Sequence, residues 1–202
     1  AAQYASRAQL NYKGTVAIAP ASNLALILTA GESQAATKPL AEQIPMLAQL
    51  DTYTALIVAG MQGHNNTVAY NTVFKTDTLA LAPVAESECS SAVANILGNG
   101  MLTYATGAGL GSLSGYGRMQ SGFMNIPVIN TFLQTGSQPG LVPIKQNVFI
   151  YQGDADTTVP KVATDILITS MKGNGTSASN IKYMTNATWD HGTVYTQNYA
   201  SF

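Results

Sequence analysis

Charged residues are scarce in this chain. Asp, Glu, Lys and Arg make up 9% of its 202 residues, against roughly 25% in an average soluble protein. The formal net charge is −1, and no cluster of basic residues favours nucleic acid or an anionic membrane surface. Ser, Thr, Asn, Gln and Gly supply the polarity instead. We interpret this composition as favouring a secreted or periplasmic protein.

Cysteine and histidine are also rare. The single cysteine, Cys89, is either a free, partly buried thiol or the partner of a cysteine on a segment outside this chain. The two histidines, His64 and His191, give no spacing typical of a metal site, and we expect neither a metal nor a cofactor. No uninterrupted apolar run reaches the ~20 residues of a membrane span.

What the chain does contain is an alternation of strand and helix patterns towards its two ends. Apolar runs at residues 14–19, 147–151 and 181–184 each predict a buried strand. Their order with the intervening helices predicts parallel strands with right-handed crossovers, and so an α/β fold. Helices are expected at residues 1–9, around 24–28, at 39–50, at 53–61, at 160–173 and after Gly192.

Residues 63–142 follow a less regular pattern. Glycine is frequent there, and the short apolar pieces at 92–97 and 126–133 predict only brief helices. A long irregular insertion inside a compact domain is usually a lid or a binding region. We therefore predict three parts, which are a core segment at 1–22, a helical cap or lid at 23–142, and a second core segment at 143–202.

The strongest motif has the form G-x-x-D-x-x-V-P and runs from Gly153 to Pro160, directly after a predicted strand. In open α/β sheets, the loops at the carboxyl ends of the strands build the active site. His191 stands on the loop after the next predicted strand, so Asp156 and His191 are expected to meet. In such a pair the acid holds the imidazole in one tautomer, and the imidazole moves a proton to and from a nucleophile.

Other residues compete for these roles. Asp154 is the alternative acid, although the register of the motif favours Asp156. Both could instead be turn residues that cap the following helix. We interpret Asp190 as a loop residue rather than a catalytic acid. His64 lies in a glycine- and asparagine-rich stretch, and we interpret it as a polar loop residue.

The chain resembles the secretory lipase family of α/β-hydrolases. The resemblance is carried by the stretch from Val16 to Leu24, the Gly153–Pro160 motif and His191-Gly192. It implies the C-terminal half of an α/β-hydrolase fold and a carboxylic ester hydrolase, a lipase or esterase, with Asp156 as the acid and His191 as the base. Apolar residues of the insertion would then form an acyl pocket or lid: Leu97, Met101, Leu102, Leu110, Met119, Phe123, Met124, Ile126 and Phe132.

The nucleophile of that family is missing from the sequence. No G-x-S-x-G occurs, and the resemblance places this elbow, with its serine and oxyanion hole, just before Ala1. We therefore expect an upstream half of the same enzyme as the partner, present as a cleaved companion chain or present when the fold formed. Ser33 is the weak alternative nucleophile, because an elbow needs a preceding strand and residues 24–28 predict a helix.

Two further functions remain open from the sequence. If the chain is naturally complete, the missing serine favours a non-catalytic α/β-hydrolase-like module that binds an apolar ligand or a partner, whereas the Asp156–His191 pair weighs against it. A peptidase or acyltransferase on the same fold is the other possibility, because a fold does not fix a substrate.

Overall fold

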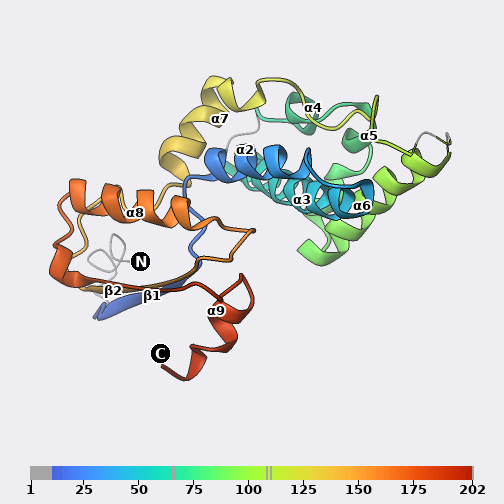
Figure 1. Cartoon of the computed structure of the whole chain (residues 1–202). Helices are drawn as coiled ribbons and strands as arrows, with labels where there is room; N and C mark the ends of the chain where they lie inside the picture. The colour runs from blue at the N-terminus through green and yellow to red at the C-terminus, as the bar shows by residue number, and fades with distance from the viewer. Residues whose placement is uncertain (1–10, 65–66, 108, 110, 202) are drawn as a thin grey trace. The chain divides into compact units, whose positions relative to one another are not determined.

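The computed structural model describes residues 11–64, 67–107, 109 and 111–201, and the chain divides into two compact units (Figure 1). The first, which we call the sheet unit, comprises Ala1–Ile27 and Phe132–Phe202. The second, the helical unit, comprises Leu28–Thr131. The helix expected at residues 1–9 lies outside the described residues. The three-part division at residues 22 and 142 stays a prediction.

The sheet unit is built on three parallel strands in the order β1-β2-β3. The strands are β1 (Gly14–Ile18), β2 (Asn147–Gly153) and β3 (Ile181–Asn186). The predicted parallel strands are therefore confirmed, and so is a mixed α/β architecture in which helices flank a small parallel sheet. The last two strands run two residues further than the apolar runs that predicted them, because their final residues pair Gln152 with Thr185 and Gly153 with Asn186.

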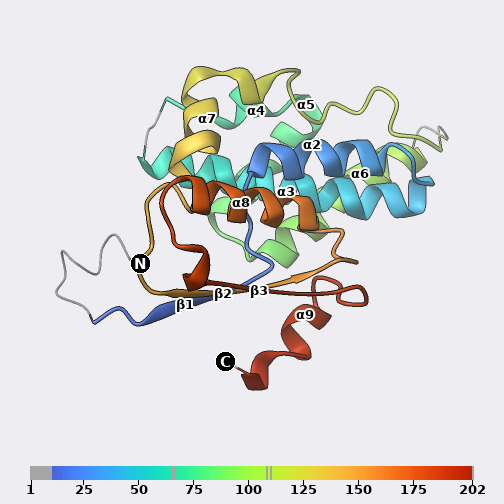
Figure 2. The ribbon, with the colours of Figure 1, turned by 60° about the vertical axis from the view of Figure 1, so that its left-hand side comes forward.

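Helices lie on opposite sides of this sheet, as Figures 1 and 2 show for α8 (Lys161–Gly173) and α9 (Thr193–Thr196). On one face, Val148 and Ile150 of β2 pack against α8. On the other face, Tyr151 packs with residues of α9 and the preceding loop. The unit also holds a π-helical turn, η3 (Phe132–Gly136), and two 3₁₀ turns, η4 (Ala178–Asn180) and η5 (Tyr199–Ser201).

The α9 face of the sheet is covered only in part. Val16 of β1 and Phe149 of β2 are register partners, and side chains alternate along a strand, so both point to the same face as Tyr151. Their exposed fractions are 45% and 37%. Parallel sheets are normally covered on both faces, and this sheet presents two large apolar side chains to solvent within the described structure.

A single long helix forms the centre of the helical unit. α3 (Leu40–His64) spans the two shorter helices expected at 39–50 and 53–61, so that prediction is wrong. The polar interruption at Asp51–Thr52 does not break the helix, because Thr52 Oγ1 donates to the carbonyl oxygen of Ala48 at 2.7 Å and the buried Asp51 carboxylate pairs with Arg118.

The region expected to be irregular is largely helical. Its longest element, α6 (Ser90–Gly107), extends beyond the brief helix expected at 92–97 and continues through Gly98 and Gly100. A Cβ at Gly98 would lie 3.4 Å from Ala48 Cβ, and one at Gly100 would lie 2.5 Å from Leu81 Cδ1. These glycines therefore allow close packing within a helix. The remaining elements are α2 (Leu24–Ala35), α4 (Tyr70–Val73), α5 (Thr76–Leu79), η1 (Ala82–Glu86), η2 (Phe123–Asn125) and α7 (Pro127–Thr131).

One helix among the described residues, Leu40–Gly63 of α3, is long and apolar enough to cross a membrane by length and composition alone. The helix is not an uninterrupted apolar run, because Glu42, Gln43 and Asp51 lie within it. Within this helix, 56% of the most apolar stretch is buried inside the structure. The helix also packs on α6, as the core helix of a folded protein does.

Candidate functional site: an acid–histidine pair

Asp156 lies in the loop that follows β2, and its side chain has no exposed surface. Oδ1 accepts hydrogen bonds from the backbone N–H groups of Thr158 at 2.9 Å and Val159 at 2.8 Å. A carboxylate oxygen that takes two backbone donors is held in one orientation. The second oxygen, Oδ2, is thereby aimed away from its own loop.

Two backbone hydrogen bonds clamp this loop to the loop that follows β3. The Asp154 N–H donates to the carbonyl oxygen of Asn186 at 3.0 Å, and the Ala155 N–H donates to that of Trp189 at 3.1 Å. The close approach requires glycine at position 153, because a Cβ there would lie 2.0 Å from the Trp189 carbonyl oxygen. The first glycine of the G-x-x-D motif therefore brings the two loops together.

His191 occupies the second of these loops and meets Asp156. Its Nδ1 lies 2.9 Å from Asp156 Oδ2. Since a carboxylate can only accept, the imidazole donates through Nδ1, and the lone pair of the neutral ring is on Nε2. Among the residues that the structure describes, none makes a hydrogen bond to Nε2, and 45% of the His191 side chain is exposed. Nε2 is thus available to a proton donor from outside.

The surroundings raise the pKa of His191 above 6.5, its ordinary value. The hydrogen bond to Asp156 is the largest cause, partial burial opposes it, and the negative charges of Asp156 and Asp190 add to it. The arrangement therefore stabilises the imidazolium that forms when Nε2 takes up a proton.

The competing acids have other places. Asp190 Oδ1 accepts from the N–H groups of Gly192 and Thr193 at 2.9 and 2.7 Å, which caps α9, and these hydrogen bonds lower the pKa of Asp190. The side chain of Asp154 is exposed and only its backbone joins the clamp. Of the three aspartates, Asp156 is the one whose carboxylate contacts the His191 ring.

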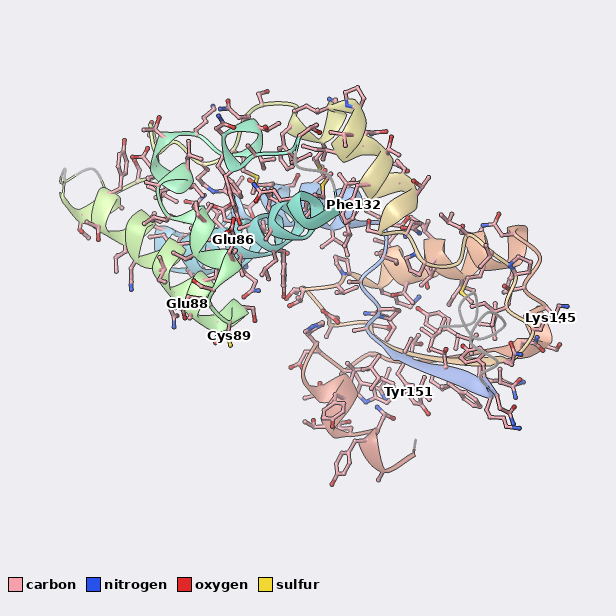
Figure 3. The ribbon with its side chains drawn as sticks, turned by 180° about the vertical axis from the view of Figure 1, so that it is seen from behind. Glu86, Glu88, Cys89, Phe132, Lys145 and Tyr151 are labelled. Carbon is pink, nitrogen blue, oxygen red and sulfur yellow. The ribbon has the colours of Figure 1, made fainter. Side chains whose placement is uncertain are left out.

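The other candidates lie elsewhere. Ser33 is an exposed residue inside α2, and its Oγ donates to the Thr29 carbonyl oxygen at 2.9 Å, so no strand precedes it. His64 is the last residue of α3, and its side chain lies outside the described structure. Cys89 lies just before α6 (Figure 3) and is exposed, so the expectation of a partly buried thiol is wrong. A partner cysteine on a segment outside this chain stays a prediction.

Gln152 belongs to this site and was missed in the sequence. Its side chain is fully buried, and Nε2 lies 3.5 Å from Asp156 Oδ2. A polar residue that continues the alternation of Val148 and Ile150 in a buried strand was the available signal, because a buried amide must find partners.

The helical unit holds a second polar cluster, around Arg118. The guanidinium donates to Glu32 through Nη1 at 2.9 Å and Nη2 at 2.8 Å, and its Nε donates to Asp51 at 3.1 Å. Burial raises the pKa of Asp51 to about 6, although Arg118 opposes the shift. Burial alone would lower the pKa of Arg118, but the two carboxylates outweigh it and raise that pKa.

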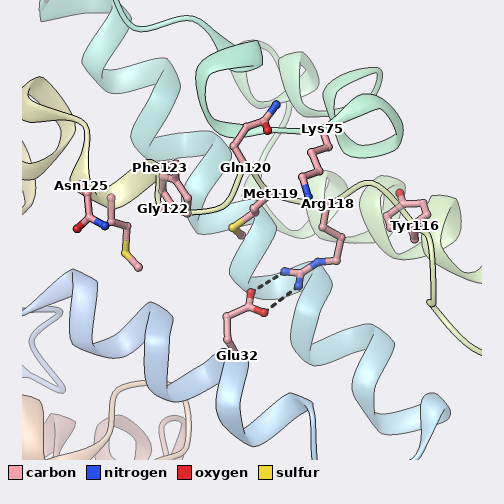
Figure 4. A pocket seen from close by; sticks show the side chains of 10 residues that line it. Glu32, Lys75, Tyr116, Arg118, Met119, Gln120, Gly122, Phe123 and Asn125 are labelled. Atoms are coloured by element: carbon pink, nitrogen blue, oxygen red, sulfur yellow. Dashed lines mark hydrogen bonds and ion pairs between the residues drawn. The ribbon is translucent and has the colours of Figure 1, made fainter.

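A cavity of about 390 Å³ adjoins this cluster (Figure 4). Three residues expected in an acyl pocket line it, Met119, Phe123 and Met124, together with Glu32, Lys75 and Arg118. Leu97 and Met101, also expected there, are fully buried on α6, because that helix packs its apolar face into the unit. Leu110 lies outside the described residues.

No group of His, Cys, Asp or Glu that would hold a metal ion is found in the part of the chain that the structure describes. Comparisons with known proteins found no family model, no curated protein and no solved structure that matches the chain. The resemblance to the secretory lipase family therefore stays a prediction from the motifs.

Proposed function

We propose that this chain supplies the acid and the histidine of a carboxylic ester hydrolase, a lipase or esterase of the secretory lipase type. The observation that carries the proposal is the 2.9 Å contact between His191 Nδ1 and the buried Asp156 Oδ2. It joins two loops at the carboxyl ends of neighbouring parallel strands, which is where α/β enzymes place their chemistry. A binding module has no need for such a pair.

In the proposed mechanism, His191 Nε2 takes the proton of a serine hydroxyl while the serine attacks the ester carbonyl carbon. Asp156 holds the ring and stabilises the imidazolium that results. His191 then gives the proton to the leaving alkoxide, which leaves an acyl-enzyme. In the second half of the reaction, His191 takes a proton from water, the hydroxide attacks the acyl group, and the proton returns to the serine.

The serine belongs, in this proposal, to an upstream half of the same enzyme, carried by a companion polypeptide. Two observations support a companion. The sequence has no G-x-S-x-G, and none of the described residues reaches His191 Nε2 with a hydroxyl or thiol. The partly open sheet face with Val16 and Phe149 offers that companion an apolar surface, since parallel sheets are normally covered on both faces.

The ester substrate and a secreted or periplasmic location rest on the resemblance and on the low content of charged residues. The reaction needs neither a metal nor a cofactor. A peptidase or an acyltransferase would use the same first step, the formation of an acyl-enzyme. The Asp156–His191 pair therefore does not distinguish these enzymes from an esterase, and only their substrates do.

Fluorophosphonate labelling of the native preparation, read by the intact mass of each polypeptide, tests the proposal. We expect the label on a companion chain or an uncleaved longer form, and we expect His191→Ala to abolish labelling. A label on the 202-residue chain would make Ser33 the leading nucleophile and would refute the companion serine. Full esterase activity in the His191→Ala protein would refute the triad itself and favour the non-catalytic module.

A further inference from the structure

Gln152 is a polar side chain on an otherwise apolar strand face. Val148 and Ile150 of β2 pack against α8, and Gln152 follows them in the same alternation. Its side chain is fully buried. A buried carboxamide is costly unless its polar atoms are hydrogen bonded, and an aliphatic residue would serve the packing of α8 equally well. The sheet alone therefore gives no reason for glutamine here.

The contacts of Gln152 span the loop that carries Asp156. Nε2 donates to the carbonyl oxygen of Gly153 at 3.1 Å and to that of Val159 at 2.9 Å, and these residues are the two ends of the loop. Oε1 accepts from Thr164 Oγ1 of α8 at 2.6 Å. Asp156 Oδ2 lies farther from Nε2, at 3.5 Å. The two amide hydrogens of Gln152 therefore go to the two nearer carbonyl oxygens, and the amide group attracts the carboxylate electrostatically at longer range.

Only a neutral group that both donates and accepts satisfies these contacts. Glutamate would set a second carboxylate beside Asp156 and against two carbonyl oxygens, and like charges at that distance repel. Leucine would fill the space but would leave the Val159 carbonyl and the Thr164 hydroxyl without this partner. The loss of each hydrogen bond would reduce the free energy of unfolding. The choice of glutamine is thus explained by the loop and not by the core.

We propose that Gln152 is a positioning residue for the Asp156–His191 pair, because its carboxamide fixes both ends of the acid loop and so keeps Asp156 Oδ2 within hydrogen-bonding distance of His191 Nδ1. Gln152 acts through Asp156 and touches no reacting atom. Its importance for catalysis rests on the proposed ester hydrolase function, whereas the positioning is a property of this chain alone.

The test is a proton NMR titration of His191 in the whole chain, in a His64→Gln background that leaves one imidazole. Gln152→Leu is expected to lower the pKa of His191 towards that of a free imidazole, because Asp156 is no longer held against the ring. Asp190, the other carboxylate near His191, is untouched. The matched control is Ile150→Val, which loosens the same strand face and is expected to leave the titration of His191 unchanged.

Thr164→Val serves as a second variant if Gln152→Leu does not fold. It removes the hydrogen bond to Gln152 Oε1 with almost no change of shape, and the expected shift of the His191 titration is downward and smaller. A His191 titration identical to the parent in Thr164→Val, and in Gln152→Leu where it folds, would overturn the proposal. The readout needs no substrate. If the His191 titration shifts but the reconstituted protein has no esterase activity, only the proposed function is refuted. If the protein is active but the titration does not shift, only the positioning role is refuted.

Discussion

The buried side chain of Asp156 makes three hydrogen bonds shorter than 3 Å, and each has a separate consequence. The two backbone N–H groups that donate to Oδ1 fix the orientation of the carboxylate. The hydrogen bond between Oδ2 and His191 Nδ1 places the negative charge beside the imidazole. Removing that charge while keeping the shape should therefore be read out at His191.

Asp156→Asn should lower the pKa of His191, because the hydrogen bond to the carboxylate is the largest cause of its rise. Proton NMR titration in the His64→Gln background measures it. In an active reconstituted enzyme the same change should reduce kcat by roughly 10³–10⁴-fold, since the amide favours the wrong tautomer. An unchanged His191 titration would show that the pair does not persist in solution.

The same pair makes stability depend on pH. The pKa of His191 is higher in the folded chain, so the folded state binds the proton more tightly. The resulting stabilisation is fully present below the unfolded value of 6.5 and is lost as the pH rises through the folded value. The difference in the free energy of unfolding between the parent and Asp156→Asn should therefore become smaller at alkaline pH. Urea titrations at several pH values measure it.

Gly153 makes the contact between the two loops possible, and Gly153→Ala should break it. The added Cβ would meet the Trp189 carbonyl oxygen at 2.0 Å, and a backbone atom cannot yield as a flexible side chain does. We expect a loss of about 2–3 kcal/mol in the free energy of unfolding, together with a lower His191 pKa. The control Gly173→Ala, where a Cβ meets nothing within 4 Å, should be neutral or slightly stabilising in its helix.

At the scale of elements, the strands and the acid–histidine motif could be predicted because their signals are local. A β-branched run closed by a turn residue predicts a strand by itself, and a glycine before an acid at a strand end predicts a tight loop. The helical unit could not be predicted in this way. Whether Asp51 interrupts α3 depends on Arg118, a partner that is distant in sequence.

Gln152 shows the same limit inside the site. The alternation along β2 predicts that its side chain is buried. The Val159 carbonyl that accepts from its Nε2, however, comes within reach only when the loop between β2 and α8 folds back to the end of the strand. Asp156 and His191 were predictable from motif and order alone, whereas the group that holds their loop was not.

Arg118 bridges α2 and α3, and Arg118→Met should destabilise the helical unit. The substitution leaves Asp51 buried without its counter-ion, which costs about 3–5 kcal/mol in comparable cases. Because the pKa of Asp51 is already about 6, the loss should be smaller below that pH, where the carboxyl takes up a proton. Urea unfolding at two pH values measures both effects.

Two further variants separate this pair from charge effects in general. Adding Asp51→Leu to Arg118→Met should recover much of the lost stability, because no buried charge then remains in the pair. Lys38→Met, which removes an exposed ion pair with Glu42 at 3.5 Å, should change stability by less than about 1 kcal/mol. Equal losses from Arg118→Met and Lys38→Met would contradict the buried pair.

At the scale of the whole molecule, the sheet is the element whose surroundings are incomplete. Val148 and Ile150 are buried on the α8 face, whereas Val16 and Phe149 are exposed on the other. If a companion covers that open face, the chain alone should expose a hydrophobic patch that binds dyes and promotes association.

Replacing both exposed residues, with Val16→Thr and Phe149→Thr, should therefore reduce dye binding and self-association of the isolated chain. Threonine is β-branched and suits a strand, so the free energy of unfolding and the His191 titration should stay near the parent values. The control Val148→Thr places a hydroxyl on the buried face and should destabilise the sheet unit by about 1–3 kcal/mol. If the double variant instead unfolds as Val148→Thr does, the open face is packed within this chain and offers no surface to the proposed companion.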